Sequence, residues 1–265
     1  MTRNDRFAGT WYPGTREEIE QFIDPSAVKR RIIAGVCPHA GWIYSGRVAG
    51  EVFSQMEPAD TYVLIGPNHH GDGEAVSVYP EGAWRTPLGD LPVNAQLARE
   101  VIAACRFARP DTEAHEQEHS LEVQLPFIKY FSPKASILPI ALADYSPAVC
   151  KDLGQAIAAS LQKLNLSSNA ILIASTDMSH YLQRDVAHKL DHRAIEKVLA
   201  LDPEGLLKTV AENDISMCGS GPTAAILWAS QGLGAKNARL TRYATSGEVT
   251  GDIDQVVGYA GFIIY

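Results

Sequence analysis

The chain has 265 residues, of which 46% are hydrophobic, and its formal net charge at pH 7 is −8. This length supports one large core or two small ones, and the acidic balance without a basic stripe argues against a nucleic-acid-binding protein. The N-terminal stretch is polar, no apolar run reaches the length of a membrane span, and the four cysteines form no CxxC pair. We therefore expect a cytoplasmic protein with reduced thiols, without a signal peptide and without a membrane partner.

Strand-like apolar runs alternate with helical patterns along the whole chain. The pattern predicts strands over residues 30–37, 61–66, 73–80, 135–143, 169–176, 238–247 and 254–265. It predicts helices over residues 15–23, 46–56, 94–105, 116–131 (kinked or restarted at Pro126), 146–164, 184–201, 203–213 and 221–231. The last two strands follow each other without a helix, so part of the sheet should be antiparallel. With no linker or repeat in sight, we predict a single α/β domain over residues 1–265, with a central mixed sheet and helices on both faces.

Histidines follow three of the apolar runs, each after a break in the pattern. His39 follows the first run, His69 and His70 the second, and His180 the run that ends near residue 176. Polar turns at strand ends are where α/β sheets build their sites, and imidazole is the commonest protein metal ligand. Adjacent loop residues point in different directions, so at most one of His69 and His70 should bind a metal directly. For His39, the alternative is a turn histidine bonded to backbone.

Two acidic patterns accompany these histidines. Asp177 lies three residues before His180 and could orient its ring for proton transfer. The alternative is an aspartate that caps a turn, next to a surface histidine. Glu118, His119 and Glu122 fall on one expected helical turn. Such a charge cluster at a helix start is commonly just solvated.

Two further patterns could carry metal chemistry. His188 and His192 have the i, i+4 spacing of a zinc helix, but Lys189 stands where a metalloprotease has glutamate, so we interpret the pair as solvated. Cys218 lies in a Gly-rich stretch before a predicted helix, where free N–H groups lower the pKa of a thiol. The alternative is a buried small hydrophobic residue.

Taken together, the motifs resemble those of the Memo family, known in bacteria and archaea as the AmmeMemoRadiSam system protein B. The matching segments run in the family's order: FAGTWYPG, CPHAGWIYSG, IGPNHHG, WRTPLGDLPV, EQEHSLEVQLPF, ASTDMSHY, MCGSGP and GYAGFIIY. They extend from residue 7 to residue 265, and several together are specific where PHAG alone is not.

The resemblance implies a three-layer α/β/α fold like that of the class III extradiol dioxygenases, which are non-haem Fe(II) enzymes. It implies that His39, His69 and Cys218 are the metal ligands and that His180, with Asp177, carries protons. It places His70, Glu118, His119, Trp42 and Tyr44 in or around the pocket; packing alone is the alternative for Trp42 and Tyr44. Because Cys218 stands where the dioxygenases have a carboxylate, Fe(II) or copper is expected, zinc also suits the donors, and the dioxygenase reaction does not carry over.

The leading hypothesis is thus a metal-binding, oxidoreductase-like protein acting on a small molecule or peptide that the sequence does not identify. One alternative is a non-catalytic module that binds a peptide or a partner protein on the same scaffold; the system name implies a radical-SAM protein. Another is a metal-free thiol enzyme with Cys218 as nucleophile and His180 as base.

Overall fold

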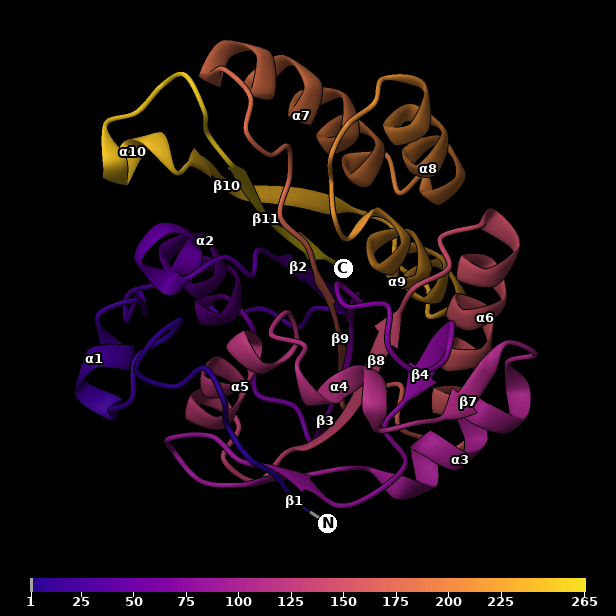
Figure 1. Cartoon of the computed structure of the whole chain (residues 1–265). Coiled ribbons are helices and arrows are strands. Elements are labelled where there is room, and N and C mark those ends of the chain that lie inside the picture. Colours follow the sequence, from indigo (N-terminus) through magenta and orange to yellow (C-terminus); the bar gives the residue numbers. More distant parts are fainter. Residues whose placement is uncertain (1) are drawn as a thin grey trace.

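The computed structural model describes residues 2–265 and has a three-layer α/β/α architecture around an eight-stranded mixed sheet (Figure 1). The strands lie in the order β10-β11-β2-β9-β3-β8-β4-β7. Their bounds are β2 Ala34–Cys37, β3 Thr61–Pro67, β4 Val76–Val78, β7 Ala108–Pro110, β8 Ser136–Leu142, β9 Ala170–Ser175, β10 Ala238–Thr245 and β11 Gly258–Ile264. The four central strands β2, β9, β3 and β8 are parallel, whereas β11 is antiparallel to both β10 and β2. The predicted mixed sheet, with its last two strands antiparallel, is confirmed.

Helices cover both faces of this sheet (Figure 1). One face packs against α3 Ala95–Ala104, α6 Pro147–Lys163, α7 Arg184–Leu199, α8 Pro203–Glu212 and α9 Ser220–Gly232. The other packs against α1 Arg16–Glu20, α2 Trp42–Ser54 and α5 Leu125–Phe131. Shorter pieces are α4 Glu113–Glu116, α10 Gly247–Thr250, the 3₁₀ turn η1 Glu122–Gln124 and a second sheet of β1 Thr2–Arg3, β5 Ala83–Trp84 and β6 Leu91–Pro92.

The two cores follow from the alternation of side chains along the strands. In β3, Val63 and Ile65 point into the core with α6 and α9, while Tyr62 and Leu64 point into the core with α2 and α5. Because both faces are covered, every residue of β3 and β9 is buried, which accounts for their uninterrupted apolar runs. Among residues 2–265, no helix combines the length and apolar character needed to cross a membrane.

One predicted helix is wrong in extent. Residues 116–131 do not form one helix: the stretch from Gln117 to Leu121 is irregular, and η1 follows. The expected restart at Pro126 is confirmed, because α5 begins at Leu125 with Pro126 in its first turn. The irregular stretch turns Glu118 and His119 toward the carboxyl ends of the central strands. This departure from helix therefore builds part of the site.

Candidate metal site

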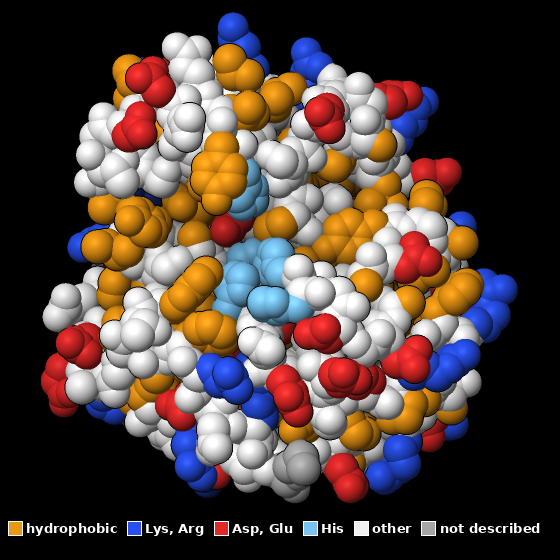
Figure 2. Space-filling view, in the orientation of Figure 1, with side chains coloured by type: hydrophobic (Ala, Val, Ile, Leu, Met, Phe, Trp, Pro, Cys, Tyr) orange, Lys and Arg blue, Asp and Glu red, His pale blue; other side chains and the backbone are white. Residues whose placement is uncertain are grey.

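A cavity of about 710 Å³ opens beyond the carboxyl ends of β2, β9 and β3. Parallel α/β sheets place ligand sites at this edge. Four histidines, His39, His69, His119 and His180, line the cavity, and Figure 2 shows histidine side chains gathered in a hollow with hydrophobic groups around it. No lysine or arginine lines this cavity among the described residues.

His39, His69 and Cys218 come together as one group of metal-ligand type. Their ligand atoms all lie within 4.8 Å of one another, and the Cys218 Sγ lies 3.2 Å from the His39 Nε2. His39 follows β2, His69 follows β3, and Cys218 lies just before α9. The structure thus brings together the three residues that the resemblance named as ligands, from segments far apart in the chain.

Glu118 holds the His69 ring in one tautomer. Its carboxylate accepts a hydrogen bond from the His69 Nδ1 at 2.9 Å, and it also accepts from the backbone N–H groups of His69 and Ser120. Burial raises the pKa of Glu118, but these hydrogen bonds outweigh burial and hold the pKa well below its usual range. The carboxylate is therefore ionised, the Nδ1 carries the proton, and the Nε2 lone pair of His69 is free to bind a metal.

The expected solvated cluster at residues 118–122 is wrong because both carboxylates are fully buried. Glu118 supports His69, while Glu122 binds the N-terminal segment. His119 stacks on the His69 ring, with 4.7 Å between the ring centroids. The ring centroids of Trp11 and His119 lie 4.3 Å apart. Burial lowers the pKa of His119 to about 4, so this ring is neutral at pH 7.

Asp177 does not orient His180, contrary to expectation. The Asp177 carboxylate accepts hydrogen bonds from the backbone N–H groups of His39 and Ala40, and thereby ties the end of β9 to the turn after β2. Burial raises the pKa of Asp177 to about 6. The His180 Nδ1 instead donates to the Ser216 carbonyl at 2.9 Å, which leaves its Nε2 free; both Asp177 and His180 line the cavity.

The thiol of Cys218 is also different from expectation. Burial, reinforced by the charge of Asp177, raises the pKa of Cys218 instead of lowering it, although the Asp177 N–H does donate to the Sγ at 3.3 Å. Burial likewise lowers the pKa of His39. Without a metal, the pair is a neutral thiol beside a neutral imidazole, which disfavours the metal-free thiol enzyme.

The aromatic residues expected at the pocket wall divide into two roles. Trp42 is 2% exposed, stacks on Phe127 at 3.9 Å and donates its indole N–H to the Val123 carbonyl, so it packs in the core. Tyr44 lines the cavity as expected. Trp11, Tyr181 and Tyr259 also line it and were missed, because an aromatic residue in sequence looks the same whether it packs in the core or faces a cavity.

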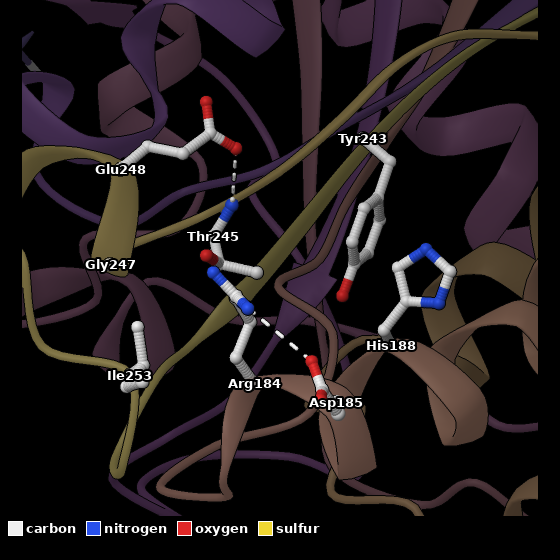
Figure 3. Close-up of a pocket in the computed structure, with 8 residues that line it drawn as sticks. All are labelled: Arg184, Asp185, His188, Tyr243, Thr245, Gly247, Glu248 and Ile253. Carbon is white, nitrogen blue, oxygen red and sulfur yellow. Dashed lines mark hydrogen bonds and ion pairs between the residues drawn. The ribbon is translucent and has the colours of Figure 1, made fainter.

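The remaining histidines lie outside the group of three. His70 is exposed. His188 and His192 stack on each other at 3.9 Å, and His192 donates from its Nδ1 to the His188 carbonyl. Figure 3 shows His188 beside Tyr243 in a separate cavity of about 300 Å³. The i, i+4 pair therefore does not belong to the group that contains His39.

Comparison with known proteins agrees with these motifs. The model of the family described as "Memo-like protein" matches residues 3–263. A MEMO1 family protein of Methanosarcina barkeri is 41% identical over 268 residues, covering 99% of each chain. One of Thermotoga maritima is 40% identical over the full length of both chains, and one of Methanopyrus kandleri is 37% identical over 99% of each.

Proposed function

Because the chain belongs to the Memo family, and because two imidazoles that line its cavity converge with a thiol, we propose that it is a metal-dependent, oxidoreductase-like protein. In this proposal His39, His69 and Cys218 hold one Fe(II) or copper ion. The single observation that carries it is the convergence of these three ligand atoms within 4.8 Å.

The spacing of the donors fits a single ion. Metal–nitrogen bonds of about 2.0–2.1 Å and metal–sulfur bonds of about 2.3 Å put a nitrogen and a sulfur ligand roughly 3.1–3.6 Å apart for angles between 90° and tetrahedral. The distance of 3.2 Å between the Cys218 Sγ and the His39 Nε2 lies in this range. Two imidazoles and one thiolate are borderline-to-soft donors that suit copper, iron and zinc better than magnesium or calcium.

The residues around the three ligands also have defined parts in this proposal. A bound Fe(II) or copper ion would supply redox chemistry and Lewis acidity. His180 lines the cavity with a free Nε2 and moves a proton at that atom, while Asp177 fixes the turn that carries His39. Trp11, Tyr44 and Tyr259 form walls that exclude water from part of the cavity.

Metal analysis of protein purified without chelator tests the ligand assignment. We expect about one equivalent of metal in the native protein and its loss in His39→Ala and in Cys218→Ser. His188→Ala is the matched control, because it removes a histidine of a different cavity, and it should keep the metal. Full metal retention in both ligand variants would refute the assignment. An anomalous-scattering map of the cavity would identify the element.

A second proposal, recognition of a partner protein, is favoured by the apolar rim of the cavity. Ile43 is 68% exposed and Tyr181 is 73% exposed, and Tyr181 holds a left-handed backbone with φ of 57°. Such outward-facing apolar groups beside a strained residue are typical of binding surfaces. The partner in this proposal is the radical-SAM protein of the same system. Calorimetric titration of the two proteins should detect a complex that Ile43→Ser with Tyr181→Ser abolishes without loss of metal; no complex with native protein would end this proposal.

A further inference from the structure

We propose that two buried residues outside the ligand set, Ser175 and Gln124, are positioning residues that select the tautomer of His39. They hold the ring proton on the Nδ1 and thereby direct the Nε2 lone pair at Cys218. The consequence of this tautomer for metal binding rests on the function proposed above. The tautomer itself is a property of the metal-free protein. Neither residue carries a sequence signal of metal chemistry.

The direction of the network starts at Gln124. Its Nε2 lies 2.8 Å from the Pro38 carbonyl and 3.0 Å from the Ser175 Oγ. A carbonyl oxygen can only accept a hydrogen bond, so the amide must present its NH₂ group on this side. The reversed amide would set two oxygens against each other in a fully buried place. Gln124 is therefore a donor to Ser175.

The hydroxyl of Ser175 then has one lone pair left to accept a hydrogen bond. It has one hydrogen to donate and two lone pairs. The Ser120 carbonyl, 2.6 Å away, can only accept and takes the hydrogen, while the Gln124 amide occupies one lone pair. The one remaining neighbour is the His39 Nδ1 at 3.0 Å, which must donate to the second lone pair. Ser175 is fully buried, so water does not compete for these positions.

The opposite tautomer is disfavoured on both sides of the ring. With the proton on the Nε2, the Nδ1 lone pair would face the oxygen of Ser175, or the hydroxyl would turn and leave the buried Ser120 carbonyl without a donor. Leaving one such group unsatisfied costs about 1–3 kcal/mol. The Nε2–H would also point at the Cys218 Sγ, at 3.2 Å, where a metal needs a lone pair; the Asp177 Oδ2 lies farther away, at 4.0 Å.

The two imidazoles are thus held in the same tautomer by different chemistry. An ionised carboxylate holds His69, whereas a neutral hydroxyl with two neutral partners holds His39. A carboxylate partner increases the basicity of a ligand imidazole, and a hydroxyl does so far less. His39 and His69 should therefore be unequal donors, with His69 the stronger.

The first test reads the tautomer directly in metal-free protein. Long-range ¹H–¹⁵N correlation spectra of ¹⁵N-histidine-labelled protein distinguish the protonated nitrogen of each ring, and His39→Gln assigns the His39 signals. We expect the Nδ1–H form in native protein, a shift toward Nε2–H in Ser175→Ala, and recovery of Nδ1–H in Ser175→Thr. Gln124→Met should give a smaller shift in the same direction, because Ser175 loses the donor that fixes its orientation but keeps the Ser120 carbonyl as acceptor. A native Nε2–H form, or an unchanged Nδ1–H form in Ser175→Ala, would overturn the proposal.

A matched control separates this effect from the loss of any buried hydroxyl. Ser230 is fully buried in α9, and its hydroxyl has no hydrogen-bond partner among residues 2–265. Ser230→Ala should leave the His39 signals unchanged. A His39 shift in this variant equal to that in Ser175→Ala would mean that the response is general and would overturn the assignment to Ser175.

The second test measures affinity with Co²⁺ alone, followed by thiolate-to-metal absorbance. Loss of a residue that orients a ligand histidine typically weakens binding about 10- to 100-fold, which is the expected change in the Kd of Ser175→Ala, with Ser175→Thr close to native. An unchanged Kd in Ser175→Ala with an altered tautomer would overturn the link to metal binding. Failure of the native protein to bind Co²⁺ would count against the proposed function, while the spectra would still decide the tautomer.

Discussion

Replacing Glu122 by glutamine should strongly destabilise the protein, because this buried carboxylate holds the N-terminal segment in place. It is fully buried and accepts hydrogen bonds from the backbone N–H groups of Arg6 and Phe7, from the Tyr12 hydroxyl, and from the Arg3 guanidinium at 2.5 Å. The amide of Glu122→Gln keeps the shape but removes the charge and turns an NH₂ group toward groups that donate.

The size of the effect follows from these contacts. The Arg3 side chain is only 7% exposed, so the variant leaves a buried cation without its partner, a change that typically costs about 3–5 kcal/mol. For a chain of this size, that loss corresponds to a fall in Tm of roughly 6–20 °C. Tyr12→Phe removes one hydrogen bond to a charged group and should cost less, about 1.5–3 kcal/mol.

Thermal unfolding followed by circular dichroism measures this effect. Glu116→Gln is the matched control, since Glu116 lies on the same stretch of chain but is exposed. The segment held by Glu122 also carries Trp11, whose backbone carbonyl accepts from the Trp42 N–H at the start of α2. A Tm for Glu122→Gln within 2 °C of native, about 1 kcal/mol or less, would refute the reasoning.

Other changes test the supports of the site and the buried polar groups. Glu118→Gln should weaken Co²⁺ binding about 10- to 100-fold in a competition titration, because His69 loses the carboxylate that orients it; Glu116→Gln should not. Burial lowers the pKa of His115 to about 4. Between about pH 6.5 and 4 the unfolded chain therefore binds more protons than the folded protein. The free energy of unfolding falls by roughly 3 kcal/mol as the pH drops through this window. His115→Gln should flatten that part of a plot of Tm against pH; an equally steep fall in the variant would contradict the assignment. Trp42→Ala should lower the free energy of unfolding by about 3–5 kcal/mol in denaturant titrations, because Trp42 is a core residue. Tyr44→Ala should change this free energy by less than about 0.5 kcal/mol. Equal losses in the two variants would contradict the core role of Trp42.

The parts of the site that could be predicted are those that local patterns control. His39 and His69 follow apolar strands, and the carboxyl ends of parallel strands meet at one edge, so their approach to each other follows from the strand order. Asn94, the first residue of the predicted helix 94–105, caps α3 through the Leu97 N–H. Cys218 is different: the Gly-rich stretch marked it as a candidate, but its place depends on how α9 packs, and only the family resemblance put it beside these histidines.

The parts that could not be predicted depend on contacts between distant residues. Burying Glu118 is favourable only because His69 and Ser120 donate to it, and the spacing of charges within residues 116–131 carries no sign of those donors. Ser175 ends an apolar strand and looks in sequence like one more core residue. Its role comes from three neighbours on other segments.

The stretch of residues 118–124, which is irregular up to Leu121 and continues as η1, reaches both imidazoles at once. Glu118 contacts the His69 ring, while Ser120 and Gln124 act on the His39 ring through Ser175. Proteins open locally in cooperative units well below the free energy of global unfolding. One opening of this stretch would release both rings together. The dissociation rate of a bound ion should therefore follow the hydrogen-exchange rate of the amides in residues 118–124, and not the slower exchange of the strands beneath them.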